Sequence, residues 1–202
     1  MITLRLNPEG LINKKYQPFL FAQQPTQIFF GGSSSGKSVF LGDRCVLDVL
    51  TGRNYLIVRN VANTIKKSCW NEVCKSIARL GLTNQFNINK SEMTITALCN
   101  KKQILFSGLD DSEKVKSITP LDGPLTDVWI EEATEIAYQD YKQLRKRLRG
   151  ESKHKKRITL SFNPIYQTHW IFQEFFGNWV DGVDILNEEN LLIVKSTHKD
   201  NE

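Results

Sequence analysis

The stretch GGSSSGKSVF, Gly31 to Phe40, follows the apolar run QIFF and sets the interpretation of the whole chain. It matches the template G-x-x-x-x-G-K-[ST] at the four fixed positions, which are Gly31, Gly36, Lys37 and Ser38. A flexible glycine-serine turn is the alternative interpretation. With average glycine usage, a chance match in a chain of this length has a probability of about 1%. Because a strand is predicted before the loop and a helix after it, the sequence favours a phosphate-binding loop.

Such a loop binds phosphate because small residues let successive backbone N–H groups converge on its oxygens, next to the positive end of the following helix. Lys37 is then expected to reach the outer phosphates, and the Ser38 hydroxyl to bind Mg²⁺. The predicted nucleotide-binding residues are Gly31, Gly32, Ser33, Ser34, Ser35, Gly36, Lys37 and Ser38. Gln17, upstream of the first strand, is a candidate for contacting adenine. The predicted ligands are ATP and Mg²⁺.

Strand and helix patterns alternate along the chain. Apolar runs predict strands at 27–30, 55–58, 127–130, 158–162 and 191–194, and helical spacing predicts helices at 37–50, 62–80, 137–148 and 168–176. Alternating segments at 86–88, 93–98 and 103–106 predict a β-meander rather than another crossover. The order indicates an α/β fold with a mainly parallel central sheet, flanking helices and an added meander. Ligands of such sheets bind at the carboxyl ends of the strands.

Two carboxylates, Glu131 and Glu132, follow the apolar strand 127–130. Phosphoryl transfer needs one carboxylate near Mg²⁺ and another that orients or deprotonates water. Glu131 is the candidate metal-side carboxylate, acting through a water, and Glu132 is the candidate catalytic base. Taken alone, such a pair is more often ordinary negative charge at a helix N-terminus. Ser161 and Asn163 end another strand and could reach a γ-phosphate, although a turn closing the strand explains the tetrapeptide SFNP better in isolation.

Composition suits one globular domain, residues 1–202, with 40% hydrophobic residues and a net charge of +5. The positive charge is concentrated in residues 142–157, which contain nine Lys and Arg residues and one acidic residue, Glu151. This block indicates a polyanionic partner, with a solvated helix face as the alternative at about even odds. The four cysteines and three histidines have no metal-ligand spacing, and no segment resembles a secretory signal or a membrane span. We therefore expect reduced thiols and no membrane partner.

The chain also resembles a known family, the ATPase domain of the large terminase subunit of tailed bacteriophages, in its PBSX-like group. The segments that carry the resemblance are GGSSSGKS, YLIVR, FSGLDDSEKVKSI, DVWIEEATEI, RKRLRG, SFNP, HWIFQEFF and KSTHKDN, from about residue 27 onward. The resemblance implies an ASCE-type P-loop NTPase that couples ATP hydrolysis to translocation of double-stranded viral DNA into the procapsid. It also implies a homo-oligomeric ring on the portal protein, a small terminase subunit as partner, and the cytoplasm of the infected bacterial host as location.

Two other functions are weighed against this one. The first is a nucleotide-switched assembly module that docks on a portal or regulator with negligible turnover, and the second is a small-molecule kinase. A pure switch needs no base at Glu132, and a kinase would need a lid that the short basic loops do not offer.

By the resemblance, residues 31–38 are Walker A, 128–131 are Walker B with Glu132 as the catalytic glutamate, and 161–163 are the coupling motif that senses the γ-phosphate. The catalytic set is then Glu132, Lys37 and Glu131, with Ser38 and Glu131 on the Mg²⁺ side. The Walker B acid is Glu131 where aspartate is commoner in the family.

The loop also carries Ser33 and Ser34 where many terminases have an arginine. The resemblance therefore implies a basic residue supplied by the adjacent subunit, with Lys114, Lys116 and Arg59 as candidates. DNA-binding or inter-subunit candidates are Arg145, Arg147 and Arg149. Large terminase subunits continue into an RNase H-type nuclease domain, whereas this sequence ends at Glu202, so we expect no nuclease activity from this chain alone.

Overall fold

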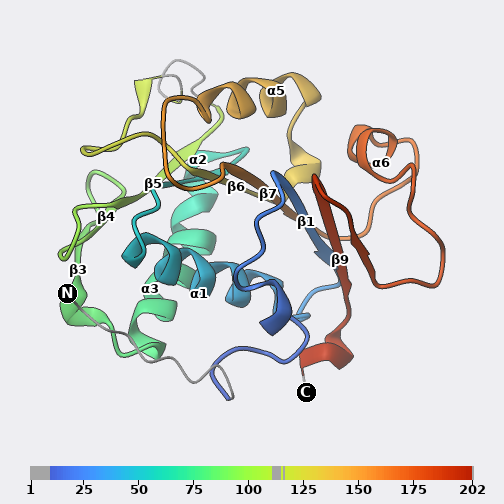
Figure 1. Cartoon of the computed structure of the whole chain (residues 1–202), viewed down its shortest axis with the longest axis horizontal. Helices are drawn as coiled ribbons and strands as arrows, with labels where there is room; N and C mark the ends of the chain where they lie inside the picture. The colour runs from blue at the N-terminus through green and yellow to red at the C-terminus, as the bar shows by residue number, and fades with distance from the viewer. Residues whose placement is uncertain (1–9, 111–114, 116, 202) are drawn as a thin grey trace.

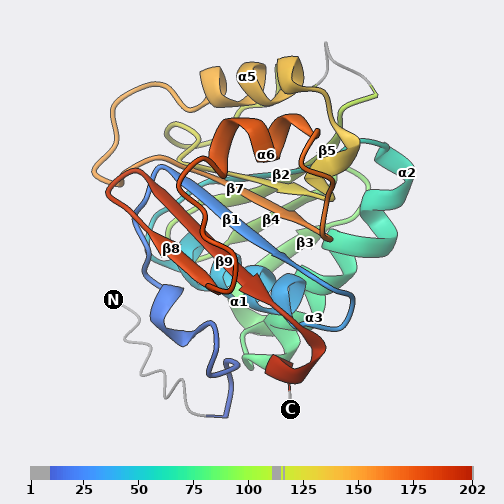
Figure 2. The same ribbon diagram turned by 90° about the vertical axis from the view of Figure 1, so that its right-hand side faces the viewer.

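The described part of the chain builds one mixed sheet with helices on both faces (Figures 1 and 2). The computed structural model describes residues 10–110, 115 and 117–201. The strands are β1 (Thr26–Gly31), β2 (Tyr55–Arg59), β3 (Phe86–Asn89), β4 (Thr94–Ala97), β5 (Gln103–Gly108), β6 (Asp127–Glu131), β7 (Arg157–Phe162), β8 (Ile185–Asn187) and β9 (Leu191–Ser196). The main helices are α1 (Lys37–Leu50), α2 (Ala62–Ile65), η2 (Lys66–Trp70), α3 (Asn71–Arg79), α5 (Tyr138–Arg147) and α6 (Trp170–Phe175). Short 3₁₀ turns are η1 (Gln17–Phe19), η3 (Thr83–Gln85), η4 (Ala133–Glu135) and η5 (His198–Asn201).

The strand order is β3-β4-β5-β2-β6-β7-β1-β9-β8. The strands from β5 to β9 in this order are parallel to their neighbours, whereas β3, β4 and β8 pair antiparallel at the two edges. The parallel strands are nearly continuous apolar runs because helices cover both of their faces. The predicted α/β class with a mainly parallel sheet is confirmed.

Helices α1 and α3 cover one face of the sheet, and α5 and α6 cover the other (Figure 2). The first face packs a core that includes Phe40, Val46 and Ile77, and the second packs one that includes Leu144 and Ile171. Within the described residues, no helix is long and apolar enough to cross a membrane.

Strand β7 lies between β1 and β6, and this order positions the site. In register, Ser161 of β7 is paired with Phe29 of β1 on one side and Glu131 of β6 on the other. Because all three strands are parallel, their carboxyl ends meet at one edge of the sheet. The loop after β1, the Glu131–Glu132 pair and the segment after Ser161 therefore lie side by side, as the sequence predicts for an α/β ligand site.

Three local details differ from the sequence prediction. The helix predicted at 62–80 is interrupted by the π-helical turn η2, where the hydrophobic spacing slips by one residue. The meander β3-β4-β5 is antiparallel as predicted, but β5 also pairs parallel with β2, so the connection from β2 is a crossover after all. The antiparallel pair of β8 with β9 was not predicted, because Ile185–Asn187 is only three residues long and gives no alternating pattern.

A buried ion network closes the amino ends of the strands, away from the loop. Arg157 is fully buried and donates from Nε to Asp127 Oδ1 at 2.6 Å and from Nη2 to Asp48 and Tyr55. Arg53 donates to the other Asp127 oxygen at 3.1 Å. Burial by itself lowers the pKa of Arg157, but Tyr55, Asp127 and Asp48 outweigh it and raise that pKa. Arg157 belongs to the basic block expected to meet a polyanion, and its burial removes it from that surface.

Candidate active site

The loop between β1 and α1 has the backbone shape that its glycines and serines predict. Ser34 (φ 62°) and Gly36 (φ 80°) adopt left-handed conformations, and Gly36 caps the start of the 14-residue helix α1. Ser33 and Ser34 are exposed, whereas Ser35 is buried. A β-carbon at Gly31 would overlap the carbonyl oxygen of Ser196, so the close approach of β9 requires glycine there. The loop thus exposes its middle next to the positive end of a helix.

Two segments distant in sequence brace this loop. The hydroxyl of Ser196, the last residue of β9, lies 3.1 Å from Ser35 Oγ. On the other side, the buried Tyr16 donates its hydroxyl to the carbonyl of Ser35 at 2.9 Å and stacks on Phe40 of α1. Sequence reasoning assigned no role to Ser196 or Tyr16. Ser196 stands in the segment KSTHKDN, the only signal that pointed toward it.

Lys37 is held by its own loop and by the segment after β7. Its Nζ donates to the carbonyls of Gly31 at 3.0 Å and Gly32 at 3.2 Å, and to Asn163 Oδ1 at 3.2 Å. Burial lowers the pKa of Lys37, while Glu132 and Glu131 act in the opposite direction. The structure therefore brings together Lys37 and Asn163, the predicted Walker A lysine and the predicted coupling residue.

Ser161, the other predicted coupling residue, has a different environment. It is buried, and its hydroxyl accepts a hydrogen bond from the indole Nε1 of Trp129 at 2.9 Å. Asn163 is exposed at the sheet edge.

Glu131 ends β6 with its side chain 8% exposed. The buried thiol of Cys69 donates to Glu131 Oε2 at 2.6 Å. Burial raises the pKa of Cys69 well above its usual range, with a further contribution from Glu131, so this thiol keeps its proton. The contact was missed at the sequence level, because nothing near Cys69 indicates that it reaches a residue 62 positions away.

Glu132 has the left-handed backbone conformation φ 50°, ψ 51°. Burial raises the pKa of its half-buried carboxyl, Arg59 lowers it, and Glu131 raises it. Glu132 lines a cavity of about 500 Å³ together with Asn163 and His169. Strained backbone and a raised carboxyl pKa are both typical of catalytic positions.

Arg59, predicted as a trans-acting candidate, ends β2 beside β6 of its own chain. Its Nη2 lies 3.7 Å from Glu135 Oε1, and its side chain is 20% exposed. Its charge acts on Glu132 of the same chain. The other two candidates, Lys114 and Lys116, lie outside the described residues.

Gln17 follows Tyr16 and donates from Nε2 to the carbonyl of Ile12 at 2.9 Å. The same N-terminal segment lines a cavity of about 680 Å³ with Asp200 and Asn201. Asn201 also contacts the loop, since its Oδ1 would lie 2.7 Å from a β-carbon at Gly36.

The donor set suits Mg²⁺ bound together with a nucleotide. Among the described residues, no group of three or more His, Cys, Asp or Glu side chains is placed to hold a metal ion. Mg²⁺ at phosphate sites takes one or two protein oxygens, and phosphates and waters complete its shell. Ser38, half-buried in the first turn of α1, offers one such ligand, and Glu131 offers a carboxylate for the predicted contact through a water.

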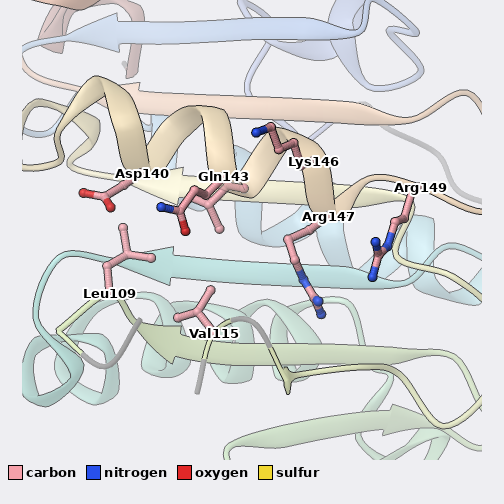
Figure 3. A pocket seen from close by; sticks show the side chains of 8 residues that line it. Leu109, Val115, Asp140, Gln143, Lys146, Arg147 and Arg149 are labelled. Atoms are coloured by element: carbon pink, nitrogen blue, oxygen red, sulfur yellow. The ribbon is translucent and has the colours of Figure 1, made fainter. Parts of the chain in front are cut away.

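The basic residues at the C-terminal end of α5 and just after it separate into two groups. Arg145, Lys146 and Arg149 are exposed, whereas Arg147 is half-buried and donates from Nη2 to the carbonyl of Ile118. Lys146, Arg147 and Arg149 line a cavity of about 260 Å³, and Figure 3 shows the side chains of Arg147 and Arg149 pointing to the same side.

Comparisons with known proteins agree with this geometry. Residues 23–202 match the family model for the phage terminase large subunit. The chain is 30% identical over 167 residues to the PBSX phage terminase large subunit of Bacillus subtilis (strain 168), covering 82% of this chain and 37% of that protein. It is 28% identical over 120 residues to the large terminase subunit of Bacillus phage SPP1, covering 59% of this chain and 28% of that protein. The chain thus spans well under half of these curated relatives.

Solved structures share the fold at low identity. The large terminase of a thermophilic bacteriophage matches with a TM-score of 0.74 at 16% identity, over 94% of this chain and 46% of that one. The N-terminal domain of the DNA packaging ATPase of bacteriophage phi29 matches with a TM-score of 0.65 at 14% identity, over 89% and 94%. These likenesses confirm the predicted ASCE-type P-loop fold. Together with the family model, they show that the chain belongs to the phage terminase large subunit family.

Proposed function

We propose that this chain is the ATPase domain of a DNA-packaging motor, hydrolysing ATP with Mg²⁺ to move double-stranded DNA. One observation carries the proposal: Lys37 Nζ lies 3.2 Å from Asn163 Oδ1 at the edge where Glu131 and Glu132 end the adjacent strand. Walker A, Walker B and the coupling motif therefore share one site. Structures of the thermophilic-phage large terminase in complex with ADP and with ATP-gamma-S support nucleotide binding at this fold.

The loop and Lys37 bind the phosphates. Exposed loop backbone and the N-terminus of α1 favour negative charge, and Lys37 exchanges its carbonyl partners for the outer phosphate oxygens. Bound Mg²⁺, held through Ser38 and by way of a water through Glu131, would neutralise charge on the phosphates. Asn163 is then released from Lys37 and becomes available to the γ-phosphate, which supports its role as the coupling residue.

Glu132 orients the attacking water and takes its proton. The carboxyl must be ionised to do so, and Arg59 favours the ionised form against the effect of burial. We therefore propose that Arg59 favours the ionised form of Glu132 in its own chain. The basic residue from the adjacent subunit is then sought at Lys114 or Lys116.

The nucleotide base is assigned to the N-terminal side of the loop. Residues 12–15 and 200–201 line the cavity of about 680 Å³ that adjoins the loop through Asn201. Gln17 borders this segment, so it remains the adenine-contact candidate.

Double-stranded DNA is assigned to the exposed basic surface at the end of α5 and just after it, principally Arg145 and Arg149. The backbone phosphates are the expected contacts, so binding is independent of sequence and weakens with salt. The hydrogen bond from Arg147 to Ile118 gives that residue a structural role instead. A homo-oligomeric ring on the portal protein, a small terminase subunit and the host cytoplasm complete the proposal, supported by family membership.

The experiment that tests this function is ATP turnover with and without double-stranded DNA. Lys37→Ala should abolish productive ATP use, and Glu132→Gln should keep nucleotide binding while turnover falls by about 10²–10⁴-fold. Arg145→Ala should weaken DNA binding and reduce its salt dependence, whereas Arg147→Ala should mainly lower stability. A Glu132→Gln protein with unchanged turnover would refute the base assignment. If the wild-type protein binds nucleotide but shows negligible turnover with or without DNA, the result would instead support the nucleotide-switched assembly module. The presence of Glu132 at the site does not favour that alternative.

A further inference from the structure

Cys69 has no role in the proposed mechanism, yet its thiol contacts the metal-side carboxylate. The Sγ to Glu131 Oε2 distance is 2.6 Å, Cys69 is fully buried, and Glu131 is 8% exposed. We propose that Cys69 is a positioning residue: its hydrogen bond fixes Glu131 in one orientation, with Oε2 occupied and Oε1 left for the Mg²⁺ side. This inference rests on the proposed function for the role of Glu131.

Cys69 lies in the π-helical turn η2, next to Trp70, and both side chains are buried. Trp70 packs edge-to-face on Phe106 at a ring distance of 5.0 Å, and the Cys69 thiol reaches Glu131 at the end of β6. Turns of this kind are frequently found at functional sites.

A thiol suits the task because an ionised carboxylate can only accept hydrogen bonds. Ser68 Oγ lies 3.1 Å from the carbonyl oxygen of Thr64, to which it donates its single proton, and 3.7 Å from the Cys69 sulfur, whose own proton goes to Glu131. Truncation to alanine would leave Oε2 buried next to a small void and free to rotate. Loss of such an outer partner of a metal ligand typically costs about 10–100-fold in metal affinity or activity.

Three variants separate positioning from packing. Cys69→Ala removes the donor, Cys69→Ser keeps a shorter one, and Cys45→Ala is the matched control. Cys45 is a second fully buried cysteine of the same core, and the carboxylates that act on it are Asp48 and Asp127 rather than Glu131 or Glu132. Calorimetric titration would measure the Mg²⁺ concentration needed for half-maximal binding of ATP-gamma-S. We expect an increase of about 10–100-fold for Cys69→Ala, a much smaller one for Cys69→Ser, and the wild-type value for Cys45→Ala.

A second measurement reads the hydrogen bond in the nucleotide-free protein. The S–H stretching band of Cys69 in the infrared should be displaced to low frequency by the carboxylate. It should disappear in Cys69→Ala and move toward the band of a weakly bonded thiol in Glu131→Gln.

Each unfavourable result has a distinct meaning. A band that Glu131→Gln does not move, or equal Mg²⁺ requirements for Cys69→Ala and Cys45→Ala, would overturn the positioning role alone. If the wild-type protein binds no Mg–nucleotide, the proposed function is overturned, together with the metal-side role of Glu131. This holds even if the S–H band of Cys69 shows the hydrogen bond to Glu131.

Discussion

Replacing Glu132 by glycine should stabilise the fold relative to alanine while both variants lose turnover. Glu132 lies at φ 50° and ψ 51°, where a residue with a β-carbon costs about 1–2 kcal/mol. Glycine avoids this cost but loses about 0.5–1 kcal/mol more chain entropy on folding than alanine does. The net difference lies between about 0 and 1.5 kcal/mol in favour of glycine, with a midpoint of about 0.75 kcal/mol. For a chain of 202 residues, the midpoint corresponds to a melting temperature about 1.5–3 °C higher.

The assay compares thermal unfolding and ATP turnover of Glu132→Gly and Glu132→Ala. Turnover should fall by about 10²–10⁴-fold in both, because both remove the base. The control pair is Glu135→Gly and Glu135→Ala, since Glu135 lies in η4 without a positive φ and glycine should be the less stable variant there. The reasoning is refuted if Glu132→Gly melts at or below Glu132→Ala, or if either Glu132 variant retains wild-type turnover.

Three further predictions follow from the same structure. Arg157→Met should lower the free energy of unfolding in urea by about 3–5 kcal/mol, because it removes one of two buried cations and leaves only Arg53 to pair with Asp127 and Asp48. Adding Asp127→Asn should recover part of the loss, and additive losses would contradict the network. Because burial raises the pKa of Glu132, kcat/KM for ATP should begin to fall at a pH above the usual glutamate pKa range as the pH is lowered. The charge of Arg59 lowers the pKa of Glu132, so Arg59→Gln should move this fall in kcat/KM to higher pH. An unchanged pH profile would exclude Arg59 from the site. The chain should not nick supercoiled plasmid with Mn²⁺, because its described acidic residues form no metal-holding cluster; cleavage that persists through further purification and is lost on mutating one acid would contradict this.

The sequence predicted the parts of the site that are contiguous in the chain. The loop from Gly31 to Ser38 encodes its own left-handed turns through small residues, and Glu131 follows an apolar run that could only be a buried strand. The sequence also predicted that the loop and Glu131 lie close together, because parallel strands bring their carboxyl ends to one edge of the sheet. The contact of Asn163 with Lys37 depends on the order of the strands in the sheet, which was not predicted from the sequence.

The parts that sequence reasoning missed depend on register and on packing between distant segments. Tyr16 and Ser196 brace Ser35 from opposite ends of the chain, and no local pattern relates them. The same limit applies to Arg59, whose position on β2 could be predicted. The strand next to β2 could not be predicted, because β6 and β7, which come later in the chain, lie between β2 and β1 in the sheet. An arginine at the end of a strand next to β6 must lie near the carboxylates of its own chain, and this adjacency, rather than residue type, separates Arg59 from the candidates for a neighbouring subunit's site.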